Sequence, residues 1–185
     1  SLFYDGRLLL KPSRIALHTD LPEADHWENI RITGTKQRHV SETVQAPFYR
    51  VKEFGIDCNE LELRLNNGFS LLMRAYNDGM AYRFVAGRKG EMTVVGERAE
   101  FNFADDFEAY IPYSTNPKDP WNMAFQNFYT KAPLTQYNTE LPAFLPLTVD
   151  AGAVKLTLLE SDLEAYPGMF VRGDGKTPAL KGVFA

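Results

Sequence analysis

Short stretches in which apolar and polar residues alternate, separated by residues that favour tight turns, constrain the fold of this chain more than any other feature. In residues 60–65 three leucines alternate with three charged residues. A period of two places the leucines on one face of a β-strand and the charges on the other. Residues 66–68 (Asn-Asn-Gly) and 77–79 (Asn-Asp-Gly) accept positive φ in turns, and they separate this segment from the apolar stretches 69–76 and 80–85. The pattern predicts three consecutive antiparallel strands.

The same alternation recurs along the rest of the chain, whereas no segment combines helical periodicity with capping residues. Residues 3–10 enclose an Asp-Gly pair, which is the strongest short hairpin signal. The aromatic stretch 121–129 is either a helical turn or an irregular loop. Roughly a dozen short strands predict an all-β fold, a large antiparallel sandwich. Further strands are expected at residues 14–18, 30–33, 41–45, 49–54, 91–95, 98–103, 107–113, 154–159, 169–172 and 179–184.

Length and composition exclude several classes of protein. With 185 residues, 44% of them hydrophobic, the chain suits one domain covering residues 1–185 with a proper core. The net charge of −4, with Lys and Arg spread along the chain, argues against nucleic-acid binding. No apolar run has the length of a membrane span. The chain starts at Ser1 with an apolar, strand-like segment and ends at Ala185 without a polar tail. These ends predict that it is a piece cut from a longer protein.

Metal-binding and nucleophilic motifs are sparse. The single cysteine, Cys58, excludes an internal disulfide and a cysteine-based zinc site, and we expect it to be buried. His18, His26 and His39 lie far apart, so we expect satisfied or exposed histidines rather than a metal site. The acidic segment 19–29 fits no calcium-loop spacing and is interpreted as a solvated connection. No serine elbow, phosphate loop or Cys-His pair supports nucleophilic catalysis within the chain.

Carboxylates are the remaining candidates for chemistry. The pair Asp105-Asp106 is interpreted as a turn former, because general acid and base work needs two acids held apart in different environments. Glu160 ends the predicted strand 154–159, and Asp162 and Glu164 follow it before Pro and Gly stop the run. An acid at a strand end can reach beyond its own sheet. Composition alone favours a solvated loop carboxylate over a ligand-binding one.

Aromatic side chains offer a second kind of candidate site, because flat rings suit the apolar faces of pyranose sugars. Tyr113 and Trp121, flanked by Pro and Asn, are the candidate sugar-stacking residues. A core position is favoured for the phenylalanines of the same region. The group as a whole comprises Tyr110, Tyr113, Trp121, Phe125, Phe128 and Tyr129.

Four segments in one order and spacing carry a resemblance to a known family. They are residues 77–84 (NDGMAYRF), 100–103 (EFNF), 145–149 (LPLTV) and 159–169 (LESDLEAYPGM). Together they resemble the N-terminal domain of glycoside hydrolase family 97. The opening segment 4–17 also resembles that domain, joined after its first strands, so the resemblance covers nearly the whole chain.

The resemblance implies a galactose-mutarotase-like β-super-sandwich, truncated at its N-terminal strands and followed in the intact enzyme by a catalytic (β/α)₈ barrel. It further implies a calcium-dependent, exo-acting bacterial α-glucosidase or α-galactosidase that is exported to the periplasm or the outer membrane. The family's catalytic residues belong to the barrel. Glu160 matches the glutamate that the N-terminal domain lends to the calcium site, although Leu159 and Ser161 replace the His and Ala that often flank it.

Three hypotheses follow. In the first, the chain packs on its own catalytic barrel and lends Glu160 to the calcium site of an enzyme that hydrolyses oligosaccharides, and alone it hydrolyses nothing. In the second, it is a carbohydrate-binding module that uses Tyr113 and Trp121. In the third, it is a purely structural interaction domain with an exposed apolar edge. The choice between glucosides and galactosides, and between inversion and retention, belongs to the barrel.

Overall fold

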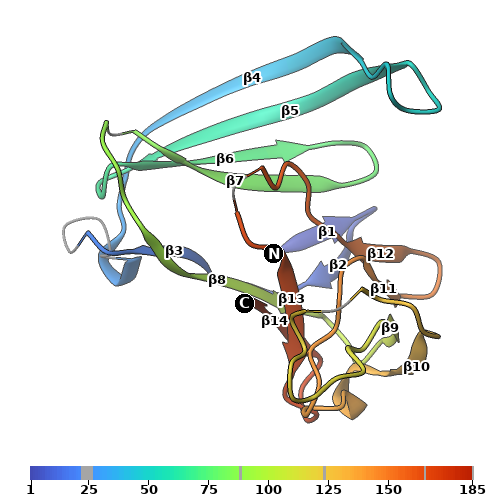
Figure 1. Cartoon of the computed structure of the whole chain (residues 1–185). Helices are drawn as coiled ribbons and strands as arrows, with labels where there is room; N and C mark the ends of the chain where they lie inside the picture. The colour runs from blue at the N-terminus through green and yellow to red at the C-terminus, as the bar shows by residue number, and fades with distance from the viewer. Residues whose placement is uncertain (22–26, 88, 123, 165, 185) are drawn as a thin grey trace. The chain divides into compact units, whose positions relative to one another are not determined.

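The computed structural model describes residues 1–21, 27–87, 89–122, 124–164 and 166–184, and nearly all of its regular structure is β-strand (Figure 1). The chain divides into two compact units: unit 1 contains Ser1–Ala16 and Gly96–Ala185, and unit 2 contains Leu17–Val95. The described strand pairings are antiparallel, which confirms the expected all-β class. Within the described ranges, no helix is long and apolar enough to cross a membrane.

Unit 1 begins with the hairpin of β1 (Leu2–Tyr4) and β2 (Arg7–Leu10). Its turn residues Asp5 and Gly6 have φ of 47° and 72°, so the expected Asp-Gly turn is confirmed. One four-stranded sheet follows the order β10-β9-β11-β12, and another follows β13-β14-β8-β3, in which β3 and β8 contain residues of both units. These strands are β3 (Ile15–Thr19), β8 (Val94–Asn102), β9 (Glu108–Ile111), β10 (Thr130–Pro133), β11 (Leu147–Asp150), β12 (Lys155–Leu158), β13 (Met169–Gly173) and β14 (Ala179–Phe184).

The core of unit 1 forms where the alternating apolar residues of these strands meet. Along β12 the side chain of Leu158 is buried while Lys155 and Thr157 are exposed, as the two-residue period predicts. Each large apolar side chain removed from water contributes about 1.5–3 kcal/mol. The core contains Phe103, Ala109, Ile111, Leu134, Tyr137, Ala143, Leu147, Val149, Leu158, Val171 and Leu180.

Tyr137 links two segments of this core through hydrogen bonds from its hydroxyl. It follows the short 3₁₀ turn η2 (Leu134–Gln136), and its hydroxyl lies 2.7 Å from the carbonyl of Val171 and 3.0 Å from that of Leu141. Burial raises the pKa of Tyr137 well above its ordinary value. Gly173 lies against the ring, because a Cβ there would sit 2.7 Å from Cγ of Tyr137. Only a residue without a side chain fits beside the ring.

Unit 2 contains a four-stranded meander in the order β4-β5-β6-β7. Its strands are β4 (Ile32–Gln45), β5 (Glu53–Leu65), β6 (Phe69–Ala75) and β7 (Met80–Ala86). The three antiparallel strands expected from residues 60–85 are therefore confirmed, and Gly68 adopts the expected positive φ of 85° between β5 and β6. On one face, Trp27 of the 3₁₀ turn η1 (Trp27–Asn29) packs against Phe69 and Phe84.

Several predicted boundaries are wrong. The strands expected at residues 30–33 and 41–45 are one strand, β4, because the backbone pairs with β5 throughout and Gly34 only shifts the register. Residues 91–95 and 98–103 likewise do not form two strands but contribute to the single strand β8. Residues 49–52 form a bend, so β5 begins later than expected. The described residues of the stretch 121–129 form an irregular loop.

Candidate functional site

Glu160 lies just after the end of β12, as predicted, and it is neither fully exposed nor part of the hydrophobic core. The backbone N–H of Met169, at the start of β13, donates to both carboxylate oxygens, with N···O distances of 2.9 and 2.8 Å. This contact holds the carboxylate at the base of the loop that joins β12 to β13. Because one N–H serves two oxygens, each oxygen keeps further acceptor capacity.

The electrostatic surroundings disfavour an isolated negative charge on Glu160. Burial raises the pKa of this carboxyl, the N–H of Met169 lowers it, and the negative charge of Glu97 raises it again, so the pKa lies above its ordinary value. The hydroxyl of Tyr166 lies 2.8 Å from Oε2 of Glu97 and fixes this second acid. A cation placed beside Glu160 would relieve this cost.

The donor set fits a hard oxygen-seeking cation such as calcium, but only in part. Calcium takes six to eight oxygen ligands. Within the described part of the chain, no group of three or more His, Cys, Asp or Glu side chains could hold a metal ion. Glu160 can therefore contribute to a calcium site whose remaining ligands come from elsewhere, and the chain does not assemble a complete site from its described acidic residues and histidines.

The other predicted acids do not join Glu160 in a catalytic pair. Asp162 and Glu164 are exposed, and Asp162 has a positive φ of 63°. Asp106 has a structural contact instead, because its carboxylate accepts hydrogen bonds from the backbone N–H and the hydroxyl of Thr135, at 2.9 and 2.6 Å. This arrangement fixes the bend between β8 and β9 to the start of η2.

Both candidate sugar-stacking residues are partly buried and lie in different ring clusters. Tyr113 packs edge-on against Tyr137 with 5.0 Å between ring centroids, and its hydroxyl accepts a hydrogen bond from the backbone N–H of Asn138 at 2.7 Å. Trp121 packs edge-on against Phe170, also at 5.0 Å. These contacts engage both rings within unit 1.

Phe128, for which a core position was favoured, is instead 92% exposed. Its neighbour Tyr129 is also exposed, whereas Phe125 packs against Tyr129 and Phe144. The periodicity of this stretch could not separate the buried ring from the exposed one, because the described part of the loop has no regular structure.

The histidines and the cysteine agree with their structural interpretation where they are described. His39 is exposed and lies 3.6 Å from Asp57 and 3.5 Å from Asn59. His18 is partly buried, and His26 lies outside the described residues together with residues 22–25 of the acidic segment 19–29. Cys58 is a buried free thiol, as expected.

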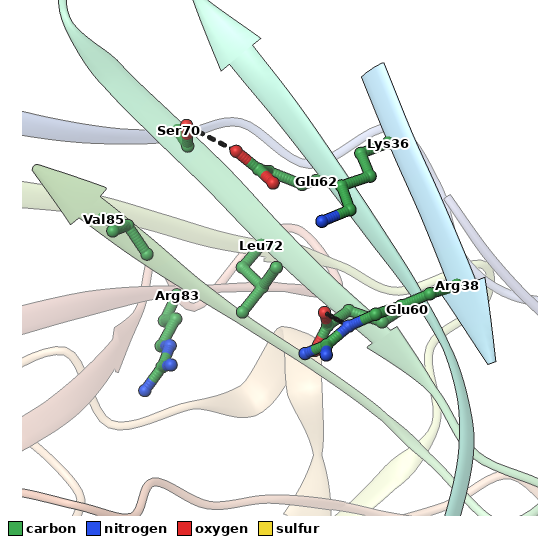
Figure 2. Close-up of a pocket in the computed structure, with 8 residues that line it drawn as sticks. All are labelled: Lys36, Arg38, Glu60, Glu62, Ser70, Leu72, Arg83 and Val85. Carbon is green, nitrogen blue, oxygen red and sulfur yellow. Dashed lines mark hydrogen bonds and ion pairs between the residues drawn. The ribbon is translucent and has the colours of Figure 1, made fainter. Parts of the chain in front are cut away.

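A polar hollow, which the sequence did not predict, lies on the other face of the β4–β7 sheet (Figure 2). Its most buried charged residue is Glu60, only 6% exposed, although the alternation predicted a solvent-facing charge. The carboxylate is held between Arg38, 2.5 Å away, and Arg74, 2.8 Å away. Hydrogen bonds and charge from these guanidinium groups lower the pKa of Glu60 to about 2. The hollow is lined by Lys36, Arg38, Glu60, Glu62, Ser70, Leu72, Arg83 and Val85.

The comparison with curated proteins identifies two relatives. The chain is 40% identical over 188 residues to a retaining alpha-galactosidase of Bacteroides thetaiotaomicron, a match that covers 98% of this chain and 28% of the relative. It is 28% identical over 136 residues to a probable retaining alpha-galactosidase of Streptomyces bingchenggensis, covering 71% of this chain and 21% of the relative. The chain thus spans less than a third of the length of either relative.

Solved structures and a family model agree with this relationship. A glycoside hydrolase family 97 enzyme from Pseudoalteromonas sp. strain K8, in complex with acarbose, superposes with a TM-score of 0.76 at 17% identity, covering 95% of this chain and 27% of that one. A beta-arabinopyranosidase superposes with a TM-score of 0.81 at 18% identity, covering 98% and 31%. These matches confirm the expected antiparallel sandwich fold. The family model for the glycosyl-hydrolase 97 N-terminal domain matches residues 1–185, and the chain belongs to that family.

Proposed function

We propose that this chain is the N-terminal domain of a calcium-dependent, exo-acting α-glycosidase, and that it packs on the enzyme's catalytic barrel and lends Glu160 to the calcium ion beside the active site. The half-buried Glu160 carboxylate, oriented by the N–H of Met169 and close to a second acid, carries the proposal. The 40% identity to a retaining alpha-galactosidase favours α-galactosides over α-glucosides and retention over inversion.

Glu160 would act by holding an oxygen ligand in place. A bound calcium ion would supply a fixed positive charge that can polarise a substrate oxygen. The N–H of Met169 orients the carboxylate before the cation arrives, so little side-chain freedom is lost on binding. Glu97, fixed by Tyr166, adds negative charge nearby and strengthens the attraction for the cation.

The calcium dependence of the full-length enzyme tests this role. In Glu160→Gln the side chain keeps its size but loses its charge, and we expect at least tenfold more calcium to be needed for half-maximal hydrolysis of p-nitrophenyl α-galactoside. Glu164→Gln is the matched control, because this exposed acid lies in the same loop. Equal calcium dependence of the Glu160→Gln variant and the wild type would remove the proposed role.

Exposed apolar side chains support packing against another part of the polypeptide. The tip of the β4–β5 hairpin carries Phe48, which is 96% exposed, together with Tyr49 and Val51. Contiguous exposed apolar side chains of this kind mark interaction surfaces. We propose that the catalytic barrel covers this tip. The accessory-domain hypothesis and the structural-domain hypothesis then coincide, because both require the chain to pack against another domain.

The packing can be tested by limited proteolysis of the full-length enzyme. Phe48→Ser should expose the hairpin and raise its cleavage rate several-fold, because the side chain would lose its partner surface. Phe3→Ser, at another exposed aromatic position in unit 1, is the control. A cleavage rate unchanged by Phe48→Ser would contradict packing at the tip.

Substrate and location follow from the same proposal. Hydrolysis of p-nitrophenyl α-galactoside should exceed that of the α-glucoside by at least tenfold in the full-length enzyme, and equal rates would contradict the assignment. We also propose export to the periplasm or the outer membrane. Fractionation of the native cells should then place the enzyme outside the cytoplasm.

A further inference from the structure

The loop that joins β12 to β13 is fastened to the rest of unit 1 by the side chain of Tyr166. The described residues of the segment 161–168 have no regular structure, and all of them except Tyr166 are exposed. The Tyr166 hydroxyl donates to Oε2 of Glu97 at 2.8 Å, and the ring packs edge-on against Phe184 with 6.0 Å between ring centroids. A segment with so few packed side chains opens locally unless such contacts restrain it.

Both contacts of Tyr166 lie at one end of the β13-β14-β8-β3 sheet. Glu97 is on β8, and Phe184 is the last residue of β14. These two strands pair with each other, and their register, continued along both strands, places Phe184 beside Glu97. Phe184 is in turn opposite Met169, the first residue of β13. Tyr166 therefore fastens the loop next to the point where the chain enters β13.

Glu160 is held at the same point. The N–H of Met169 donates to its two carboxylate oxygens at 2.9 and 2.8 Å. N–H groups two residues apart on a strand point to the same side, and the N–H of Val171 donates to the carbonyl of Ala143 at 2.9 Å. Glu160 thus occupies the edge of β13 that faces away from β14. The loop begins at one contact with the sheet, through Glu160, and ends at a second, through Tyr166.

We propose that Tyr166 is a positioning residue for the Glu160 carboxylate. By fastening the loop to β8 and β14, it keeps Glu160 against the N–H of Met169 in the orientation that a cation needs. This inference rests on the proposed calcium role of Glu160, and Tyr166 acts through Glu160 rather than as a ligand. Partners that orient a metal ligand commonly change metal affinity 10- to 100-fold. Tyr166 acts one contact further away, so we expect a loss of at least threefold without its hydroxyl.

The negative charge of Glu97 is a separate contribution that variants can distinguish from positioning. In Tyr166→Phe the ring stays against Phe184 and Glu97 keeps its charge, so only the hydrogen bond is removed. In Glu97→Gln the amide oxygen can still accept from the Tyr166 hydroxyl, but the charge is lost. Positioning should therefore fail in the first variant and persist in the second.

Hydrogen exchange of the full-length enzyme without calcium measures the restraint on the loop. The backbone amides of residues 160–169 should exchange at least threefold faster in Tyr166→Phe than in the wild type, because the loop opens more often. Glu97→Gln should exchange as the wild type does. Tyr4→Phe, at an exposed tyrosine of the same unit, is the control and should also be unchanged.

Equilibrium dialysis with calcium measures the consequence for the ligand. Tyr166→Phe should bind calcium at least threefold more weakly than the wild type, and Tyr4→Phe should bind it equally well. In the Glu160→Gln background, Tyr166→Phe should cause no further loss, because its effect passes through Glu160. A merely structural role would weaken calcium binding by the same factor in both backgrounds.

Three results would overturn the positioning role: unchanged exchange of residues 160–169 in Tyr166→Phe, unchanged calcium affinity in that variant, or an equal loss of affinity in the Glu160→Gln background. If Glu160→Gln weakens calcium binding and Tyr166→Phe does not, the positioning role fails while the proposed function stands. If Glu160→Gln itself binds calcium as the wild type does, the proposed function fails, and the positioning role fails with it.

Discussion

Glu60 gives the sharpest prediction about stability. Its carboxylate is 6% exposed and lies between the guanidinium groups of Arg38 and Arg74. In Glu60→Gln the amide fills nearly the same space but carries no charge, so the two arginines lose the anion that holds them together. Removing one partner from a buried charge cluster is costly because the remaining charges stay where they are without compensation.

The magnitude follows from the proton affinity of Glu60. A pKa of about 2 in place of 4.5 corresponds to about 3 kcal/mol, at roughly 1.4 kcal/mol per tenfold change in proton affinity. Water screens part of this, because the Arg38 side chain is 56% exposed. We therefore expect Glu60→Gln to lower the free energy of unfolding by about 2 kcal/mol at pH 7.

The effect should depend on pH with a defined sign. The folded-state pKa of Glu60 lies below the unfolded-state value, so the carboxylate contributes its full stability above about pH 5. This contribution is lost as the pH falls toward about 2, where the folded carboxylate also becomes protonated. The difference between wild type and Glu60→Gln should thus be large at pH 7 and shrink steadily below pH 5.

Urea unfolding with matched variants measures this difference. Glu62→Gln is the control, because this residue lies on the same strand and face but is more exposed and bonded less closely, at 3.3 Å to Arg64. We expect it to cost less than about 1 kcal/mol. A Glu60→Gln variant no less stable than Glu62→Gln, or a difference that persists unchanged at pH 3, would refute the reasoning.

Two further predictions concern unit 1. Gly173→Ala should destabilise the protein by about 1–3 kcal/mol, because the new Cβ would sit 2.7 Å from Cγ of Tyr137. The control Gly55→Ala, whose new Cβ would have nothing within 4 Å, should change the melting temperature little. Equal melting temperatures of the two variants would contradict the tight contact at Gly173. Asp106→Ala should cost about 1 kcal/mol in thermal unfolding, because two hydrogen bonds to Thr135 are lost, and no change would mean that solvent replaces them fully.

The sequence predicted those parts of the fold that local chemistry dictates. The Asp5-Gly6 hairpin and the meander of residues 60–85 were predictable, because turn residues and apolar alternation act over a few neighbours. The length of β4 was not predictable, because residues 35–39 lack apolar alternation and pair with β5 through the backbone and through polar side-chain contacts such as that of Arg38 with Glu60. β8 was divided at Gly96 for a similar reason, since a glycine weakens the strand signal without ending the strand.

The sequence predicted the candidate site only where the place of a residue depends on its position along the chain. Glu160 follows a strand with one buried face, so its place at a strand end could be read from the sequence. Its contact with Met169 and its proximity to Glu97 depend on how distant strands meet. Likewise, the burial of Glu60 required the register that brings Arg38 and Arg74 to either side of it.

The central claim is that Glu160 contributes a ligand to calcium, and direct measurement of calcium binding tests it best. Equilibrium dialysis of the full-length enzyme, with bound calcium determined by atomic spectroscopy, gives affinity and stoichiometry without relying on activity. Because Glu160→Gln removes a charged oxygen ligand, it should weaken calcium binding at least tenfold, while Glu164→Gln should bind as the wild type does. Calcium binding of equal affinity in wild type and Glu160→Gln would contradict the account.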